Sequence, residues 1–95
     1  MNAPHPPIEF FCEGFSYRDG LLCCGNHSVT DMAASAGTPL WIYSLDAISE
    51  KYRGYEQAFA PLRHGTMYAV KANSSLAILR TLSREGCGFD VNSRG

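Results

Sequence analysis

The sequence carries almost no net charge and contains no long apolar run. Eight basic and nine acidic residues give a formal net charge of −1 over 95 residues. This balance gives no electrostatic reason to expect nucleic acid or an anionic membrane as a partner. No stretch approaches the ~20 apolar residues of a membrane span, and the first residues lack the basic flank and apolar core of a signal peptide. We therefore expect a globular protein of the cytoplasm.

Motifs of paired cysteines and histidines are also missing. The four cysteines, Cys12, Cys23, Cys24 and Cys87, include one adjacent pair and no C-x-x-C spacing. Reduced thiols are therefore favoured, and a disulfide framework stays the alternative. The three histidines lie far apart, with none at ligand spacing from a cysteine or another histidine. The sequence thus predicts no metal site.

The first half of the chain predicts a β-rich segment with one helix. Aromatic residues and the turn Arg18-Asp19-Gly20 favour a hairpin over 10–24. A helix is predicted over roughly 29–36, capped by Ser28 or Thr30 and ended by Gly37. The continuous apolar run of residues 40–43 predicts a buried strand.

The second half alternates helical and strand patterns. A helix begins near Ser44 or Asp46, and its apolar residues fall on one face: Leu45, Ile48, Tyr52, Tyr55 and Phe59. A strand follows over 66–72, then a helix capped by Ser74 or Ser75 and ended by Gly86 or Gly88. A further strand begins over 89–92. Strands alternating with helices indicate an α/β protein with parallel strands. The last strand leaves an open edge, so we expect the chain to be truncated.

Only two lysines occur, and their settings differ. Lys51 falls on the polar part of the predicted helix, which indicates a solvated charge. Lys71 closes the strand over 66–72, where alternation puts Met67, Ala69 and Lys71 on one face. Functional groups gather at the carboxyl ends of strands in barrels and open α/β sheets. Lys71 is therefore the candidate reactive residue.

The chemistry of Lys71 depends on its surroundings. A lysine amine with its ordinary pKa of about 10.4 is protonated and not nucleophilic at neutral pH. Desolvation at a strand end frees the amine to condense with an aldehyde, and the small residues Ala69 and Ala72 leave room for a flat ring. A buried lysine paired with a carboxylate such as Asp90 fits the same pattern. From spacing alone both interpretations stay open.

Four segments resemble the fold-type III pyridoxal-phosphate decarboxylases, in that family's order. Tyr68–Asn73, with the letters YAVKAN, resembles the lysine motif, and Gly37–Tyr43 resembles the first strand. Leu76–Gly86 is similar to the helix after the lysine, and Gly88–Gly95 to the second barrel strand. The resemblance covers roughly residues 15–95.

The resemblance implies a fold and a cofactor. The chain would contain the start of a pyridoxal-phosphate-binding (β/α)8 TIM-like barrel, like that of alanine racemase, over 44–95. Residues 10–43 would contribute to a separate β-domain, after a flexible arm over 1–9. Lys71 would carry pyridoxal phosphate, with Ala69 beside it and Asp90 at the cofactor-facing end of the second barrel strand. Asp90 fits a structural hydrogen-bonding role equally well. The residues that bind the phosphate and the substrate would lie outside this chain.

The resemblance also implies an activity. Ala72 stands where the ornithine group tends to carry cysteine, which favours decarboxylation of meso-diaminopimelate to L-lysine. Related enzymes acting on ornithine, arginine or another amino acid stay as alternatives. So do a non-catalytic pyridoxal-phosphate-binding protein and an inactive truncated product. We expect a small-molecule amino-acid substrate, a homodimer at full length, no nucleic acid or membrane as partner, and no activity from residues 1–95 alone.

Overall fold

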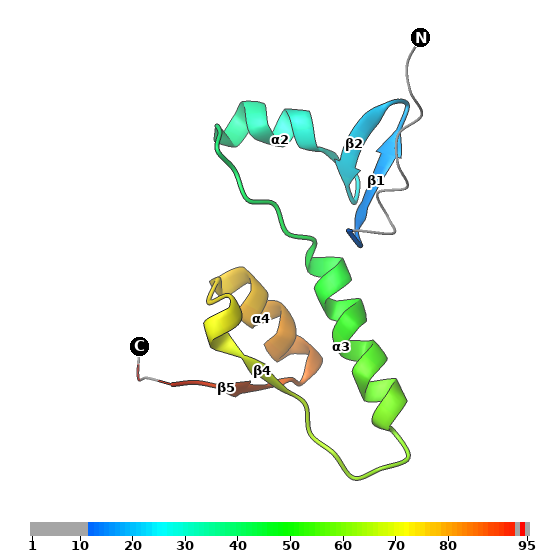
Figure 1. Ribbon diagram of the computed structural model, residues 1–95, viewed down its shortest axis with the longest axis vertical. Coiled ribbons are helices and arrows are strands. Elements are labelled where there is room, and N and C mark those ends of the chain that lie inside the picture. Colours follow the sequence, from blue (N-terminus) through cyan, green and yellow to red (C-terminus); the bar gives the residue numbers. More distant parts are fainter. Residues whose placement is uncertain (1–11, 93, 95) are drawn as a thin grey trace. The chain divides into compact units, whose positions relative to one another are not determined.

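The computed structural model describes residues 12–92 and residue 94 (Figure 1). The predicted arm over 1–9 and the beginning of the predicted hairpin lie outside the described residues. The chain divides between Asp46 and Ala47 into two compact units, and each is described by itself. No helix in the described part is both long and apolar enough to cross a membrane.

The first unit contains a three-stranded antiparallel sheet in the order β1-β2-β3. The strands are β1 (Phe15–Arg18), β2 (Leu21–Cys24) and β3 (His27–Ser28). Asp19 and Gly20 link β1 to β2 with φ angles of 51° and 78°. Two positive φ angles in a two-residue link match the strand twist, as in a type I′ hairpin. The predicted hairpin is confirmed for the described residues.

The helix α2 (Val29–Ala36) follows β3 directly. The Ser28 side chain accepts a hydrogen bond from the Asp31 backbone N–H at 3.3 Å, so Ser28, not Thr30, is the cap. Gly37 ends the helix with a φ of 85°, a conformation that favours glycine. Both boundaries of the predicted helix are confirmed.

The buried strand predicted over residues 40–43 is wrong. These residues form neither strand nor helix, and Trp41 is 86% exposed. A strand exists only as part of a ladder, and the described residues include no strand paired with this run. Apolar composition alone therefore does not produce a buried strand here.

The second unit contains a parallel βαβ arrangement preceded by a helix. Its elements are α3 (Leu45–Phe59), β4 (Met67–Ala69), the single 3-10 turn η1 (Val70–Ala72), α4 (Leu76–Glu85) and β5 (Gly88–Asp90). β4 pairs with β5 in parallel, as predicted, and α4 makes the crossover. Gly86 ends α4 in the left-handed conformation with a φ of 94°, and its N–H bonds back to the helix.

The core of the second unit lies between its helices and one face of the strand pair. It is formed by buried residues of α4 and the following loop, with half-buried residues of α3, β4 and β5 packed against them: Ile78, Leu82, Cys87, Ile48, Tyr52, Tyr68 and Phe89. The Tyr68 and Phe89 rings meet edge to face, with centroids 6.5 Å apart. Both helices therefore cover the same face of the strands. The apolar face predicted for α3 is only partly buried, since Tyr55 on that face is 59% exposed.

Candidate active site

Lys71 lies in the turn η1, immediately after β4. The strand predicted over 66–72 is wrong at its end, because β4 stops at Ala69 and the chain turns over Val70–Ala72. Strand alternation therefore does not extend to Lys71, and the prediction that it shares a face with Met67 by alternation fails. Its position at the carboxyl end of a parallel strand remains as predicted.

Local hydrogen bonds explain why the strand stops there. The Tyr68 hydroxyl donates to the Asn73 backbone carbonyl at 2.9 Å, which closes the chain around η1. The Asn73 side-chain oxygen accepts from the Ser75 N–H at 2.9 Å, at the N-terminus of α4. Asparagine commonly forms such turns with the backbone two residues ahead. Tyr68 and Asn73 thus fix the turn that presents Lys71, a role that sequence patterns did not reveal.

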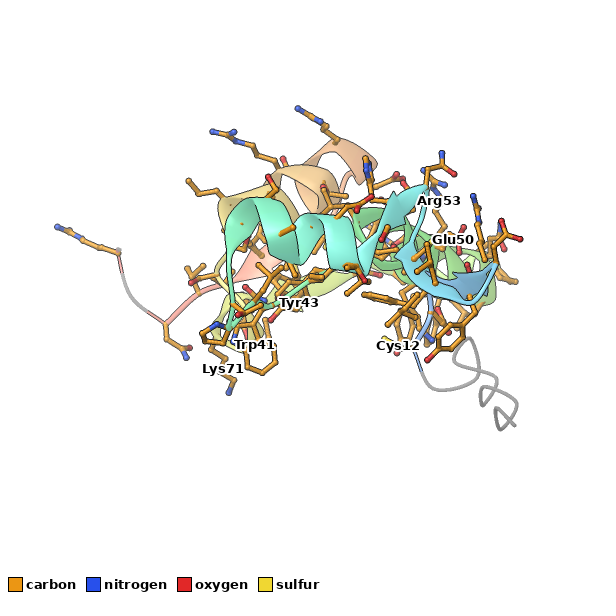
Figure 2. The ribbon with its side chains drawn as sticks, turned by 90° about the horizontal axis from the view of Figure 1, so that it is seen from above. Cys12, Trp41, Tyr43, Glu50, Arg53 and Lys71 are labelled. Carbon is orange, nitrogen blue, oxygen red and sulfur yellow. The ribbon has the colours of Figure 1, made fainter. Side chains whose placement is uncertain are left out.

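The Lys71 side chain is exposed, and Figure 2 shows it projecting away from the ribbon. The alternative of a buried lysine–carboxylate pair is therefore wrong for the described structure. The desolvation predicted for the amine is likewise not supplied by the described residues. An accessible primary amine at a strand end is what attachment of an aldehyde requires.

Ala69 and Asp90 lie directly opposite each other in the parallel register of β4 and β5. They point to the face away from the helices, because their neighbours Tyr68 and Phe89 pack on the helix side. Ala69 is half-buried and Asp90 is exposed. Ala69 and Asp90 are thus neighbours at the end of the strand pair, and Lys71 follows in the turn two residues after Ala69. Whether they bind a cofactor stays a prediction.

Gly88 lies on the same face at the other end of the strand pair, under the side chain of Met67. A Cβ built on Gly88 would lie 2.1 Å from Met67 Sδ, so any larger residue would push the exposed Met67 side chain aside. Met67 therefore covers this face at Gly88, and the small side chain on the face is that of Ala69, at the end of β4 next to Lys71.

An open groove of about 830 Å³ adjoins Lys71 along α4 and β5. Apolar side chains, among them Val70, Leu79 and Phe89, form part of its lining, and Arg80 contributes a positive charge. In the described part of the chain no group of three His, Cys, Asp or Glu side chains is arranged to hold a metal ion. The groove lies on the helix side of the strands with Phe89, whereas Ala69 lies on the other face. The exposed Lys71 amine is therefore the feature of this site that fits a cofactor attaching through an aldehyde.

The four cysteines are free thiols. Cys23 and Cys87 are buried, and Cys12 is exposed. Burial raises the pKa of the half-buried Cys24 thiol, and a hydrogen bond with Ser44 partly opposes this shift. The raised pKa makes Cys24 a weaker nucleophile at neutral pH. We assign these cysteines no part in the candidate site.

Comparison with known proteins identifies the second half of the chain. Residues 45–95 match the pyridoxal-binding domain of the pyridoxal-dependent decarboxylases. The chain is 44% identical to diaminopimelate decarboxylase of Pseudomonas aeruginosa over 81 residues, which are 85% of this chain and 20% of that protein. The diaminopimelate decarboxylase of Vibrio cholerae is 39% identical over 82 residues, again 85% of this chain and 20% of the relative.

A more distant organism gives the same result. Diaminopimelate decarboxylase of Archaeoglobus fulgidus is 37% identical over 81 residues, which are 85% of this chain and 19% of that protein. No solved structure matches. The chain spans about a fifth of the length of the curated relatives it matches. It belongs to the pyridoxal-dependent decarboxylases, whose cofactor is pyridoxal phosphate, and residues 45–95 correspond to their pyridoxal-binding domain.

Proposed function

We propose that the protein carrying this chain decarboxylates meso-diaminopimelate to L-lysine, with Lys71 as the residue that holds pyridoxal phosphate. The observation that carries the proposal is the exposed amine of Lys71 at the carboxyl end of β4, inside the segment that matches the pyridoxal-binding domain. The proposed substrate is that of the similar proteins described above, which are diaminopimelate decarboxylases. Residues 44–95 would then form the beginning of a (β/α)8 barrel, and residues 10–43 would contribute to a β-domain.

Each residue of the site has a distinct task in this proposal. Lys71 would hold the cofactor through its primary amine at the carboxyl end of β4. Ala69 leaves space for the ring, and the Asp90 carboxylate offers a negative group on the same face of the strands. When bound, pyridoxal phosphate supplies an electron sink for the bond that releases carbon dioxide. A proton replaces the lost carboxyl group in the product.

The desolvation that the Lys71 amine needs must come from segments beyond the described residues, because Lys71 is exposed here. We therefore propose that residues 1–95 alone do not catalyse the reaction. A (β/α)8 barrel usually needs about 250 residues, and the described part of the chain holds two parallel strands. The proposal predicts that a longer chain is needed to complete the site.

A comparison of substrates tests the proposed reaction. The protein is expressed from its complete coding sequence, supplied with pyridoxal phosphate, and assayed for carbon dioxide release from meso-diaminopimelate, ornithine and arginine. We expect the highest kcat/KM with meso-diaminopimelate, and lysine as its product. A preference for ornithine or arginine would reject this substrate while keeping the decarboxylase. A bound cofactor without turnover of any of the three would reject catalysis.

A further inference from the structure

Glu56, near the end of α3, uses both of its carboxylate oxygens to hold the residues that precede β4. Oε1 accepts a hydrogen bond from the Thr66 hydroxyl at 2.8 Å, and Oε2 lies 3.1 Å from Nε2 of His64. Thr66 directly precedes the first residue of β4. A single carboxylate thus joins the helix to the loop and to the start of the strand.

The two nitrogens of the His64 ring both face acceptors. Nδ1 lies 2.9 Å from the Leu62 backbone carbonyl, and Nε2 faces the Glu56 carboxylate. Neither partner has a proton to donate, so a neutral imidazole satisfies one contact and the imidazolium satisfies both. The Phe59 ring adds a packing contact, with its centroid 5.8 Å from that of His64. The loop between α3 and β4 therefore offers an acceptor to each ring nitrogen of His64, an arrangement that the imidazolium satisfies in full.

We propose that Glu56, His64 and Thr66 form a pH-dependent clasp that fixes the start of β4 to α3 and is tightest when His64 is protonated. The proposal concerns the end of β4 opposite Lys71 and does not depend on the proposed function. The clasp would determine where β4 begins, and hence the register in which its residues pair with β5.

The electrostatics of the three groups agree with this geometry. The Leu62 carbonyl, and after it the Glu56 carboxylate, raise the pKa of His64 above its ordinary value, while partial burial opposes the shift. The Thr66 hydroxyl first, and then His64, hold the pKa of Glu56 below its ordinary value, again against partial burial. His64 and Glu56 thus each favour the charged form of the other.

Other titratable groups surround the clasp. Tyr52 of α3 also contacts the Glu56 carboxylate, and burial first, then that carboxylate, raises the pKa of Tyr52. The Cys87 thiol faces the Thr66 backbone carbonyl at 3.6 Å, and Glu85 lies beyond Tyr52. Because a raised tyrosine pKa leaves the hydroxyl neutral across the neutral range, Tyr52 does not compete with His64 as the titrating group.

The pKa of His64 is raised and the pKa of Glu56 is lowered, and together these directions define the pH range in which the clasp is complete. The raised pKa of His64 gives stability that is complete below about pH 6.5 and is lost as the pH rises through the folded-state value. The lowered pKa of Glu56 gives stability that is present above about pH 4.5 and is lost as the pH falls through its folded-state value. The clasp should therefore be complete between about pH 4.5 and 6.5. Above this window the bond between Glu56 and Thr66 remains.

Nuclear magnetic resonance on the purified chain tests the clasp. The His64 ring signals are followed through a pH titration in the wild type and in Glu56→Gln, with Glu50→Gln on the exposed part of α3 as the control. We expect Glu56→Gln to lower the pKa of His64 and Glu50→Gln to leave it unchanged. The signals of His27, in the other unit, serve as an internal reference that Glu56→Gln does not move. An identical His64 titration in wild type and Glu56→Gln would overturn the proposal.

Amide exchange of β4 provides the second readout. After correction for intrinsic exchange rates, the β4 amides should exchange several-fold more slowly at about pH 5.5 than at about pH 8.5 in the wild type. His64→Gln should remove this difference. Thr66→Val should speed exchange at both pH values, and Thr66→Ser, which keeps the hydroxyl, should restore slow exchange. Equal protection at both pH values in the wild type, or faster exchange in Thr66→Ser than in Thr66→Val, would also overturn the clasp.

Discussion

The two ends of β4 differ in how their side chains are partnered. At the amino end, Thr66 bonds to Glu56 at 2.8 Å, and the same carboxylate faces His64 at 3.1 Å. At the carboxyl end, backbone and side-chain bonds hold the turn, and the Lys71 amine is left exposed. One short strand thus separates a region of satisfied polar contacts from a region with an accessible primary amine.

This difference agrees with a general pattern in parallel α/β proteins, in which the two ends of the strands have different roles. Residues at the amino ends of strands support the fold, whereas the carboxyl ends carry the chemistry. If Lys71 holds the cofactor as proposed, the few residues from Thr66 to Lys71 separate the two tasks here. Substitutions at the two ends should therefore affect different properties, and the following predictions test how complete that separation is.

The largest effect is expected from Lys71→Ala. Because we propose that the Lys71 amine holds the cofactor, the decarboxylation rate of the intact protein should fall by on the order of 10³-fold or more in this variant. It should also lose the pyridoxyl label that borohydride reduction and peptide mapping would find on Lys71 in the wild type. Its circular dichroism and the titration of His64 should stay as in the wild type, because Lys71 is exposed and outside the core.

The other lysine provides the control for this prediction. Lys51→Ala removes a lysine of α3, outside η1 and the end of β4, so label and activity should persist. If the pyridoxyl label in the wild-type protein were found on Lys51, or on neither lysine, the assignment of Lys71 would be contradicted. A change in the His64 titration in Lys71→Ala would show that the two ends of β4 are coupled rather than separate.

The next largest effect is expected in the core between the two ends. Ile78→Ala removes a side chain that is 4% exposed and packs among α3, α4 and the strands. Such a deletion should lower the free energy of unfolding by roughly 2–5 kcal/mol. Leu76→Ala, on the same helix at a residue that is 67% exposed, should change it by about 0.5 kcal/mol or less. Denaturant unfolding of the chain measures both, and equal losses would contradict the assigned core.

Local signals in the sequence predicted much of this fold. The Asp19-Gly20 turn, the Ser28 cap and the glycines after α2 and α4 each require a particular backbone conformation within a few residues. Such signals act whatever the rest of the chain does. The parallel pairing of β4 with β5 followed from the helix between them, because a crossover is what a parallel connection needs. The candidate Lys71 rested on its predicted place at the end of a strand and on the resemblance of Tyr68–Asn73 to the family's lysine motif, and its role stays a prediction.

Features that depend on distant partners were missed. Residues 40–43 have strand-like composition, yet they lack a paired neighbour among the described residues. The end of β4 was set too late, because the bond from Tyr68 to Asn73 competes with further extension. The clasp was missed because Glu56 lies eight and ten residues from its partners, and only the folded loop brings them together. A sequence pattern indicates which face of a helix or strand is apolar and where the element ends. It does not indicate which residues meet across a folded loop.

The smallest effect is expected at the ion pair on the outside of the second unit. Arg53 of α3 donates two hydrogen bonds to Glu85 of α4, from Nε at 3.1 Å and from Nη2 at 2.5 Å. The Arg53 side chain is 59% exposed, so solvent screens much of the attraction. This contact lies outside both ends of β4. Its loss should therefore weaken the packing of α3 on α4 only slightly and leave the site and the clasp unchanged.

Glu85→Gln tests this last expectation through its pH dependence. The hydrogen bonds from Arg53 hold the pKa of Glu85 below its ordinary value, against partial burial. A lowered pKa gives stability that is present above about pH 4.5 and is lost as the pH falls through the folded-state value. Glu85→Gln should therefore lower the unfolding midpoint slightly at about pH 7, and the difference from the wild type should shrink towards pH 3. Glu50→Gln, at an exposed position of α3, is the control and should change the unfolding midpoint little. A loss from Glu85→Gln as large as that from Ile78→Ala would mean that this pair, and not the shared apolar core, holds the helices together.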